Sequence, residues 1–91
     1  MHRVRLVIRG RVQGVGFRYF VLRRAGELAI KGWVCNRPDG SVEVEAEGPR
    51  AVLATLLEAM KRGPQGARVQ SVDESWAEAP PEYRDFEIRG G

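Results

Sequence analysis

Apolar and charged residues alternate in two segments of the chain, and a period of two is that of a half-buried strand. In the first segment the apolar residues are Val4, Leu6 and Ile8, and the charged ones are Arg3, Arg5 and Arg9. In the second segment the apolar residues are Val42, Val44 and Ala46, and the charged ones are Glu43, Glu45 and Glu47. The pattern therefore predicts two strands, each with one apolar and one charged face.

Two other segments repeat apolar residues every three or four positions, which is the period of a helix with one buried face. The stripe of the first segment consists of Phe17, Phe20, Val21, Ala25 and Leu28. The stripe of the second consists of Val52, Leu53, Leu56, Leu57 and Met60. Gly48-Pro49 and Gly63-Pro64 bracket the second stripe as start and stop signals. We therefore expect helices over about 17–28 and about 49–62.

Three further strands complete the predicted elements. Residues 30–36 lead into Arg37-Pro38-Asp39-Gly40, which is typical of a tight turn, so this strand forms a hairpin with the strand that starts at Val42. The remaining strands are 69–76 and a short one at Phe86 and Ile88, separated by a loop over 78–84. Within residues 69–76, Val69 and Val72 break the alternation, which indicates a bulge.

The elements follow the order strand, helix, strand, strand, helix, strand, with a short strand added at the end. Two helices cover only one face of such a sheet, and this order is that of the ferredoxin-like fold. We predict a single α+β domain over residues 1–91, a ferredoxin-like sandwich with two helices on one face of an antiparallel four- to five-stranded sheet. A right-handed first crossover places the first and third strands side by side at the centre.

Charge is distributed unevenly along a chain whose net charge is +3. Residues 1–37 carry a net charge of +8 and residues 38–91 carry −5. A basic segment suggests an anionic ligand or a nucleic acid. The strand arginines Arg3, Arg5 and Arg9 have a second explanation, which is pairing with the strand glutamates across the sheet. Arg18 lies outside the alternation, so this pairing does not explain it.

Composition also limits the compartment and the metal chemistry. No apolar run reaches the roughly 18–20 residues of a membrane span, and arginines interrupt the N-terminal segment where a secretory leader needs an apolar core. Cys35 is the only cysteine, which fits a reducing compartment, so we expect a cytoplasmic location. Since His2 is the only histidine, the chain cannot supply four zinc ligands, and we expect no metal and no other cofactor.

The segment from Gly10 to Arg18 combines three features of an anion site. Its glycines let backbone N–H groups approach a ligand closely, and the start of a helix leaves further N–H groups unpaired and partially positive. Arg18 adds a planar fork of donors that suits a phosphate-like oxyanion. The candidate phosphate-binding residues are Gln13, Gly14, Val15, Gly16, Phe17 and Arg18. The Walker motif, the dinucleotide fingerprint and a Ser-His-Asp or Cys-His set do not occur in the sequence.

Together with the only asparagine, Asn36, this segment resembles the acylphosphatases, which are small ferredoxin-like hydrolases. The matching residues are Gly10-Arg11-Val12-Gln13-Gly14-Val15-Gly16-Phe17-Arg18 and Lys31-Gly32-Trp33-Val34-Cys35-Asn36, with support from Asp39-Gly40, Glu47-Gly48-Pro49 and Phe86-Glu87-Ile88. The resemblance implies that Arg18 binds the phosphoryl group and that Asn36 orients the attacking water. It implies hydrolysis of the carboxyl-phosphate bond of a small acyl phosphate without a metal, with inorganic phosphate as product and competitive ligand.

We expect a monomer that binds neither membranes nor nucleic acid, but two alternative functions stay open. An RNA-binding module has the same order of elements, although here the glycine-aromatic segment leads into a helix instead of lying on the open sheet face. An anion-binding module without turnover is the other alternative.

Among the aromatic residues, we expect Phe17, Phe20 and Trp33 in the core.

Overall fold

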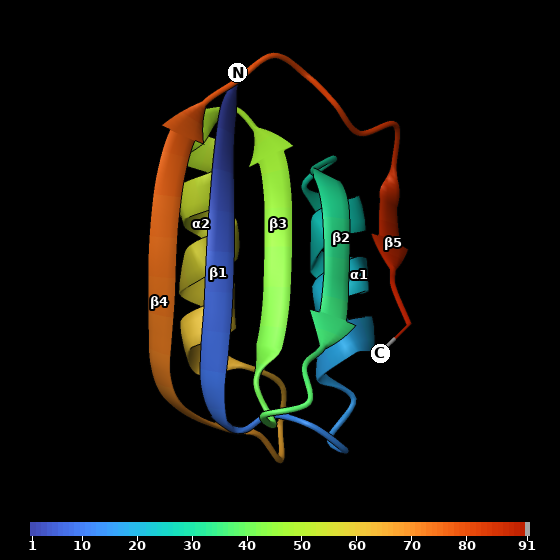
Figure 1. The fold of residues 1–91 in the computed structure, drawn as a ribbon, viewed down its shortest axis with the longest axis vertical. Helices are drawn as coiled ribbons and strands as arrows, with labels where there is room; N and C mark the ends of the chain where they lie inside the picture. The colour runs from blue at the N-terminus through green and yellow to red at the C-terminus, as the bar shows by residue number, and fades with distance from the viewer. Residues whose placement is uncertain (91) are drawn as a thin grey trace.

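The computed structural model describes residues 1–90, in which a five-stranded sheet carries two helices on one face (Figure 1). The strands are β1 (His2–Arg11), β2 (Lys31–Asn36), β3 (Val42–Gly48), β4 (Arg68–Glu78) and β5 (Phe86–Ile88), and the helices are α1 (Phe17–Glu27) and α2 (Arg50–Arg62). Every predicted element is present. Neither helix is long and apolar enough to cross a bilayer.

The strands lie in the order β4-β1-β3-β2-β5, so β1 and β3 are neighbours at the centre, as predicted. The four longer strands pair antiparallel, whereas β5 runs parallel to β2. This direction follows from the path of the chain, which leaves β4 at one end of the sheet and crosses to the opposite edge before β5 starts (Figure 1). The ferredoxin-like α+β fold is confirmed, with a sheet that is mixed because of its last, three-residue strand.

The core lies between the sheet and the helices, and it consists of the apolar residues that the two periods selected. From the strands it includes Val4, Leu6, Ile8, Val34, Val42 and Val44, and from the helices Phe17, Val21, Ala25, Leu53, Leu56 and Met60. Phe20 is half-buried and packs against this cluster. Apolar burial of this kind contributes about 25 cal/mol per Å² of surface removed from water, so the alternating pattern decides which face of the sheet the helices cover.

The expectation that Trp33 lies in the core is wrong. Its neighbour Val34 is fully buried on the helix-covered face, and successive side chains of a strand point to opposite faces. Trp33 therefore lies on the open face, where its Nε1 donates a hydrogen bond to Tyr83 Oη at 3.1 Å. The Arg89 guanidinium covers the indole ring at 5.2 Å from its centroid.

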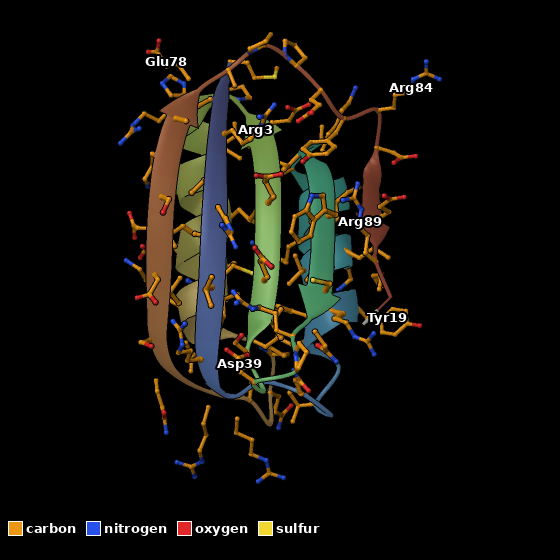
Figure 2. All side chains as sticks on the ribbon, in the orientation of Figure 1. Arg3, Tyr19, Asp39, Glu78, Arg84 and Arg89 are labelled. Carbon is orange, nitrogen blue, oxygen red and sulfur yellow. The ribbon has the colours of Figure 1, made fainter. Side chains whose placement is uncertain are left out.

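Charged pairs cover the open face, which Figure 2 shows from the front. Arg3 pairs with Glu47 at 3.2 Å and Arg5 pairs with Glu43, as the sequence predicted. Arg9 pairs instead with Asp73 of β4. The register explains this difference, because β1–β3 pairing ends at Ile8 and leaves Arg9 beyond Glu43, the first glutamate of β3.

The predicted bulge lies where β1 approaches its end. Arg9 is paired with Ser71 and Gly10 with Val69, so Gln70 of β4 has no partner and the register shifts. A bulge bends and twists a strand locally. Here it precedes the loop that joins β1 to α1.

Candidate active site

The loop between β1 and α1 is fixed at both ends by buried apolar side chains. Val12 and Phe17 are each 1% exposed, whereas Gly14 and Gly16 between them are exposed. Both glycines have a left-handed backbone, with φ of 74° and 77°, which side chains with a Cβ rarely adopt. The loop lies at the end of the sheet where β1 and β2 finish (Figure 1).

Backbone N–H groups in this loop form a cradle of unpaired donors. Within residues 1–90, the N–H groups of residues 14–19 donate to no protein acceptor; the first helical hydrogen bond runs from Phe20 N to Gly16 O at 3.1 Å. Gly14 and Gly16 flank Val15, which has a negative φ, and such alternation turns successive N–H groups toward one anion. Gly16 caps α1 without a side-chain hydrogen bond, and the first turn contains no acidic residue. No acidic side chain of the helix's own first turn therefore neutralises the positive end of its dipole.

Arg18 is the second residue of α1, and its side chain is half-buried. No carboxylate of residues 1–90 forms an ion pair with it, whereas Arg24 on the same helix pairs with Glu27 at 2.9 Å. The Arg18 guanidinium therefore keeps its full set of donors for a ligand.

Asn36 is the last residue of β2, and its side chain lies on the helix-covered face. It is two positions from the buried Val34, so the two side chains point to the same face, at the end where α1 begins. Asn36 Oδ1 is buried and accepts no hydrogen bond from the described residues. A buried acceptor without a partner costs about 1–3 kcal/mol, so its position is more consistent with a binding role than with a stabilising one.

Gln13 joins the loop to the turn after Asn36. Its Nε2 donates to the main-chain oxygens of Arg37 at 2.8 Å and Ser41 at 2.9 Å. The structure thus brings all the candidate site residues, 13–18 and Asn36, to one end of the sheet. No hydrogen bond connects the side chains of Arg18 and Asn36 within the part that the structure describes.

The turn between β2 and β3 contains hydrogen bonds between Asp39 and Ser41 that the sequence did not predict. Asp39 Oδ1 accepts hydrogen bonds from Ser41 N at 3.0 Å and from Ser41 Oγ at 2.6 Å. These bonds lower the pKa of the Asp39 carboxyl and keep it ionised. A hollow of about 150 Å³ lies beside the turn, lined by Arg9, Gly10, Asp39, Gly40 and Ser41. It includes no residue of the cradle, so we place the candidate site at the unpaired N–H groups and not in this hollow.

Cys35 is adjacent to Asn36 but points to the opposite face of the sheet. Burial, and then the nearby Glu43 carboxylate, raise the pKa of its thiol. A thiol with a raised pKa is a poor nucleophile at neutral pH. We therefore assign Cys35 no part in the chemistry.

Comparison with known proteins identifies the family of this chain. The family model for acylphosphatase matches residues 4–88. The acylphosphatase of Salinibacter ruber is 52% identical over 87 residues, which are 96% of this chain and 92% of that protein. The crystal structure of acylphosphatase from Bacillus subtilis matches with a TM-score of 0.95 at 40% identity, over 98% of this chain and 99% of that one. An acylphosphatase structure from Coxiella burnetii matches with a TM-score of 0.89 at 37% identity, over 96% and 90% of the two chains. The chain therefore belongs to the acylphosphatase family, as the resemblance in its sequence predicted.

Proposed function

We propose that this chain is an acylphosphatase that hydrolyses small acyl phosphates to a carboxylate and inorganic phosphate at the end of the sheet where the β1–α1 loop lies. The observation that carries the proposal is the row of unpaired N–H groups of residues 14–19 beside Arg18, which has no carboxylate partner. Fixed donors of this kind stabilise charge that develops on phosphoryl oxygens, and they need no reorganisation during the reaction.

The cradle and Arg18 hold the three non-bridging phosphoryl oxygens. Asn36 acts from the neighbouring strand end, where its Oδ1 accepts a hydrogen bond from the attacking water and so directs the water oxygen at phosphorus. As the P–O bond to the acyl group breaks, the electron pair leaves with the carboxylate. The water loses one proton to a phosphoryl oxygen of the substrate, which gives inorganic phosphate.

The leaving group explains why this site works without a general acid. A carboxylate is a weak base with a reference pKa near 4, so its oxygen need not be protonated as it departs. The single histidine, His2, lies at the start of β1, at the opposite end of the strand from the cradle. None of the proposed steps uses a metal, so activity should persist in EDTA. We also propose that the chain acts as a single-domain monomer in the cytoplasm, with inorganic phosphate as a competitive inhibitor.

Hydrolysis of benzoyl phosphate by the wild type and three variants tests the proposal. Arg18→Ala should lose activity by about 10²–10³-fold and weaken phosphate inhibition, because it removes donors from the transition state. Asn36→Ala should lower kcat by about 10²-fold with a smaller change in phosphate affinity. The control is Arg23→Ala, an exposed arginine of α1 without a carboxylate partner, which should retain wild-type activity.

The free energy of unfolding of each variant separates a loss of catalysis from a loss of folded protein. Arg18 makes no ion pair in residues 1–90 and is half-exposed, so Arg18→Ala should change the free energy of unfolding by less than about 0.5 kcal/mol. Full activity in Arg18→Ala would show that the site is wrongly placed. Lost phosphate binding with intact kcat in Asn36→Ala would reverse the roles of the two residues. A wild type that binds phosphate but does not hydrolyse the substrate would favour the binding module without turnover.

A further inference from the structure

The Gln13 side chain is hydrogen-bonded to the β2–β3 turn. Its Nε2 donates both protons to main-chain oxygens, one to Arg37 at 2.8 Å and one to Ser41 at 2.9 Å. An amide nitrogen has two protons, so this group has none left for a bound anion. The backbone of Gln13 leads directly into Gly14, while its side chain is bonded to a segment more than twenty residues away.

The turn that accepts these hydrogen bonds is itself held by internal hydrogen bonds. Arg37 N donates to Ser41 O at 2.9 Å, and Gly40 N donates to Arg37 O at 3.1 Å. The Asp39 carboxylate accepts from the backbone and hydroxyl of Ser41. Both acceptors of Gln13 thus belong to a closed hydrogen-bonded unit that begins directly after Asn36.

The cradle, by contrast, contains the two exposed glycines, Gly14 and Gly16, around which no atom lies within 4 Å of an added Cβ. Glycine has the largest conformational freedom of all residues, so such a loop needs external bonds to hold one geometry. Val12 and Phe17 hold its ends in the core. The Gln13 carboxamide is the side chain that fastens the loop to the unit that follows Asn36.

We propose that Gln13 is a positioning residue whose carboxamide sets the distance and angle between the N–H cradle of residues 14–19 and the side chain of Asn36. The inference rests on the proposed function, in which the cradle holds the phosphoryl group and Asn36 holds the water. In-line attack requires the two reactants within a narrow geometry, and a misplacement of about 1 Å can lower the rate by about 10²-fold. Gln13 touches neither reactant in this scheme; it acts through the loop and the turn.

The substitution Gln13→Glu gives this role a distinct pH signature. An ionised glutamate has the same shape as glutamine but no proton to donate, so its carboxylate would face two carbonyl oxygens. A protonated glutamic acid has one O–H and restores one of the two hydrogen bonds. Unfavourable contact with two carbonyls raises the pKa of such a carboxyl, which places its titration within an accessible range.

The experiment measures kcat, KM and phosphate inhibition for wild type, Gln13→Glu, Gln13→Met and Gln65→Glu between about pH 5 and about pH 8, across the titration of a raised carboxyl. Gln65 is an exposed glutamine in the α2–β4 loop, so Gln65→Glu controls for the added charge. At the upper pH, Gln13→Glu should lose about 10²-fold in kcat with a smaller change in KM. Relative to the wild type, its kcat should recover as the pH falls. Gln13→Met should be impaired at every pH, and Gln65→Glu should follow the wild type.

Two results would overturn this inference and leave the proposed function intact. Wild-type kcat in Gln13→Met would show that the hydrogen bonds are not needed. A loss in Gln13→Glu that is equal at all pH values would show that hydrogen-bond donation is not the cause. Circular dichroism at each pH verifies folding, and Gln13→Met decides the question if Gln13→Glu is unfolded at neutral pH. An inactive wild type would instead refute the proposed function, so the two failures are distinguishable.

Discussion

Replacing Glu47 by glutamine should destabilise the fold, although Glu47 lies at the end of the sheet remote from the candidate active site. Its side chain is 2% exposed. The carboxylate accepts hydrogen bonds from the backbone N–H groups of Glu82 and Tyr83 at 2.7 to 3.1 Å, and from Arg3 Nη2 at 3.2 Å. This one side chain therefore fastens the connection between β4 and β5 to the centre of the sheet.

The magnitude follows from the bonds that the substitution weakens. A hydrogen bond to a charged group contributes about 1.5–3 kcal/mol, against about 1 kcal/mol for a neutral one. A glutamine oxygen in the place of Oε1 still accepts from the N–H groups of Glu82 and Tyr83, but these bonds lose the charge of the acceptor, and the amide nitrogen in the place of Oε2 cannot accept from Arg3 Nη2. Arg3 retains a partner, because it also pairs with the Glu82 carboxylate at 3.2 Å. We therefore expect a loss of about 3 kcal/mol in the free energy of unfolding, which lowers Tm by roughly 15 °C in a chain of this size.

The same contacts predict how the stability difference between the wild type and Glu47→Gln depends on pH. Burial opposes the charge of Glu47, but the hydrogen bonds from Tyr83 and Glu82 and the Arg3 guanidinium outweigh it, so the pKa of Glu47 is lowered. A lowered pKa stabilises the folded state above the unfolded pKa of about 4.3, and the contribution is lost as the pH falls through the folded value. The stability difference between wild type and Glu47→Gln should be complete at neutral pH and shrink below about pH 4.3.

Urea denaturation followed by circular dichroism, at neutral and acid pH, measures both effects. The matched control is Glu43→Gln, which breaks the pair with Arg5, whose side chain is 53% exposed. Such a pair contributes at most about 1 kcal/mol. A Glu47→Gln variant that is no less stable than Glu43→Gln at neutral pH would refute the reasoning, as would a difference that stays constant in acid.

Two further predictions concern the loop and the open face. Gly16→Ala should weaken inhibition by inorganic phosphate, because a left-handed φ costs a residue with a Cβ about 1–2 kcal/mol while no neighbouring atom obstructs the methyl group; an unchanged inhibition constant would contradict the cradle. In Tyr19→Phe, the remaining tyrosine, Tyr83, should ionise only above the usual value of about 10, because burial and then the hydrogen bond to Glu45 raise its pKa. Phenolate absorbance measures this, and an ordinary titration would contradict the buried contact.

Local periodicity was sufficient to predict most of the fold, because the apolar face of each element is defined by its own residues. Val4, Leu6 and Ile8 are buried because they alternate on one strand, whatever the strand packs against. Trp33 shows where residue type misleads. A large aromatic side chain suggested the core, but Trp33 is adjacent to the buried Val34 on the same strand, so its side chain lies on the open face. The partner of Arg9 and the direction of β5 depend on register and on the path of the chain, which no local pattern contains.

The candidate site also has residues that the local sequence predicts and contacts that it does not. Gly14, Gly16 and Arg18 could be found because glycines at the start of a helix describe a local backbone geometry. The face on which Asn36 lies follows from counting two residues from Val34. The two hydrogen bonds of Gln13 had no such signal, because they join segments that meet only in the folded sheet and their acceptors are backbone oxygens, which every residue has.

Among the thirteen arginines, ion pairing distinguishes a paired group on the open face from an unpaired group near the candidate active site. Arg3, Arg5 and Arg9 each lie against a carboxylate on the open face, so their fields largely cancel. At the other end, where β1 and β2 finish and α1 begins, five arginines of the described chain have no ion-pair partner: Arg11, Arg18, Arg37, Arg62 and Arg68. A chain with a net charge of only +3 therefore concentrates its positive potential around the N–H cradle. Of the five, Arg18 alone lies on the first turn of α1, beside the unpaired N–H groups. Under the proposed function its charge acts on the phosphoryl group, while the others attract the anion from a distance.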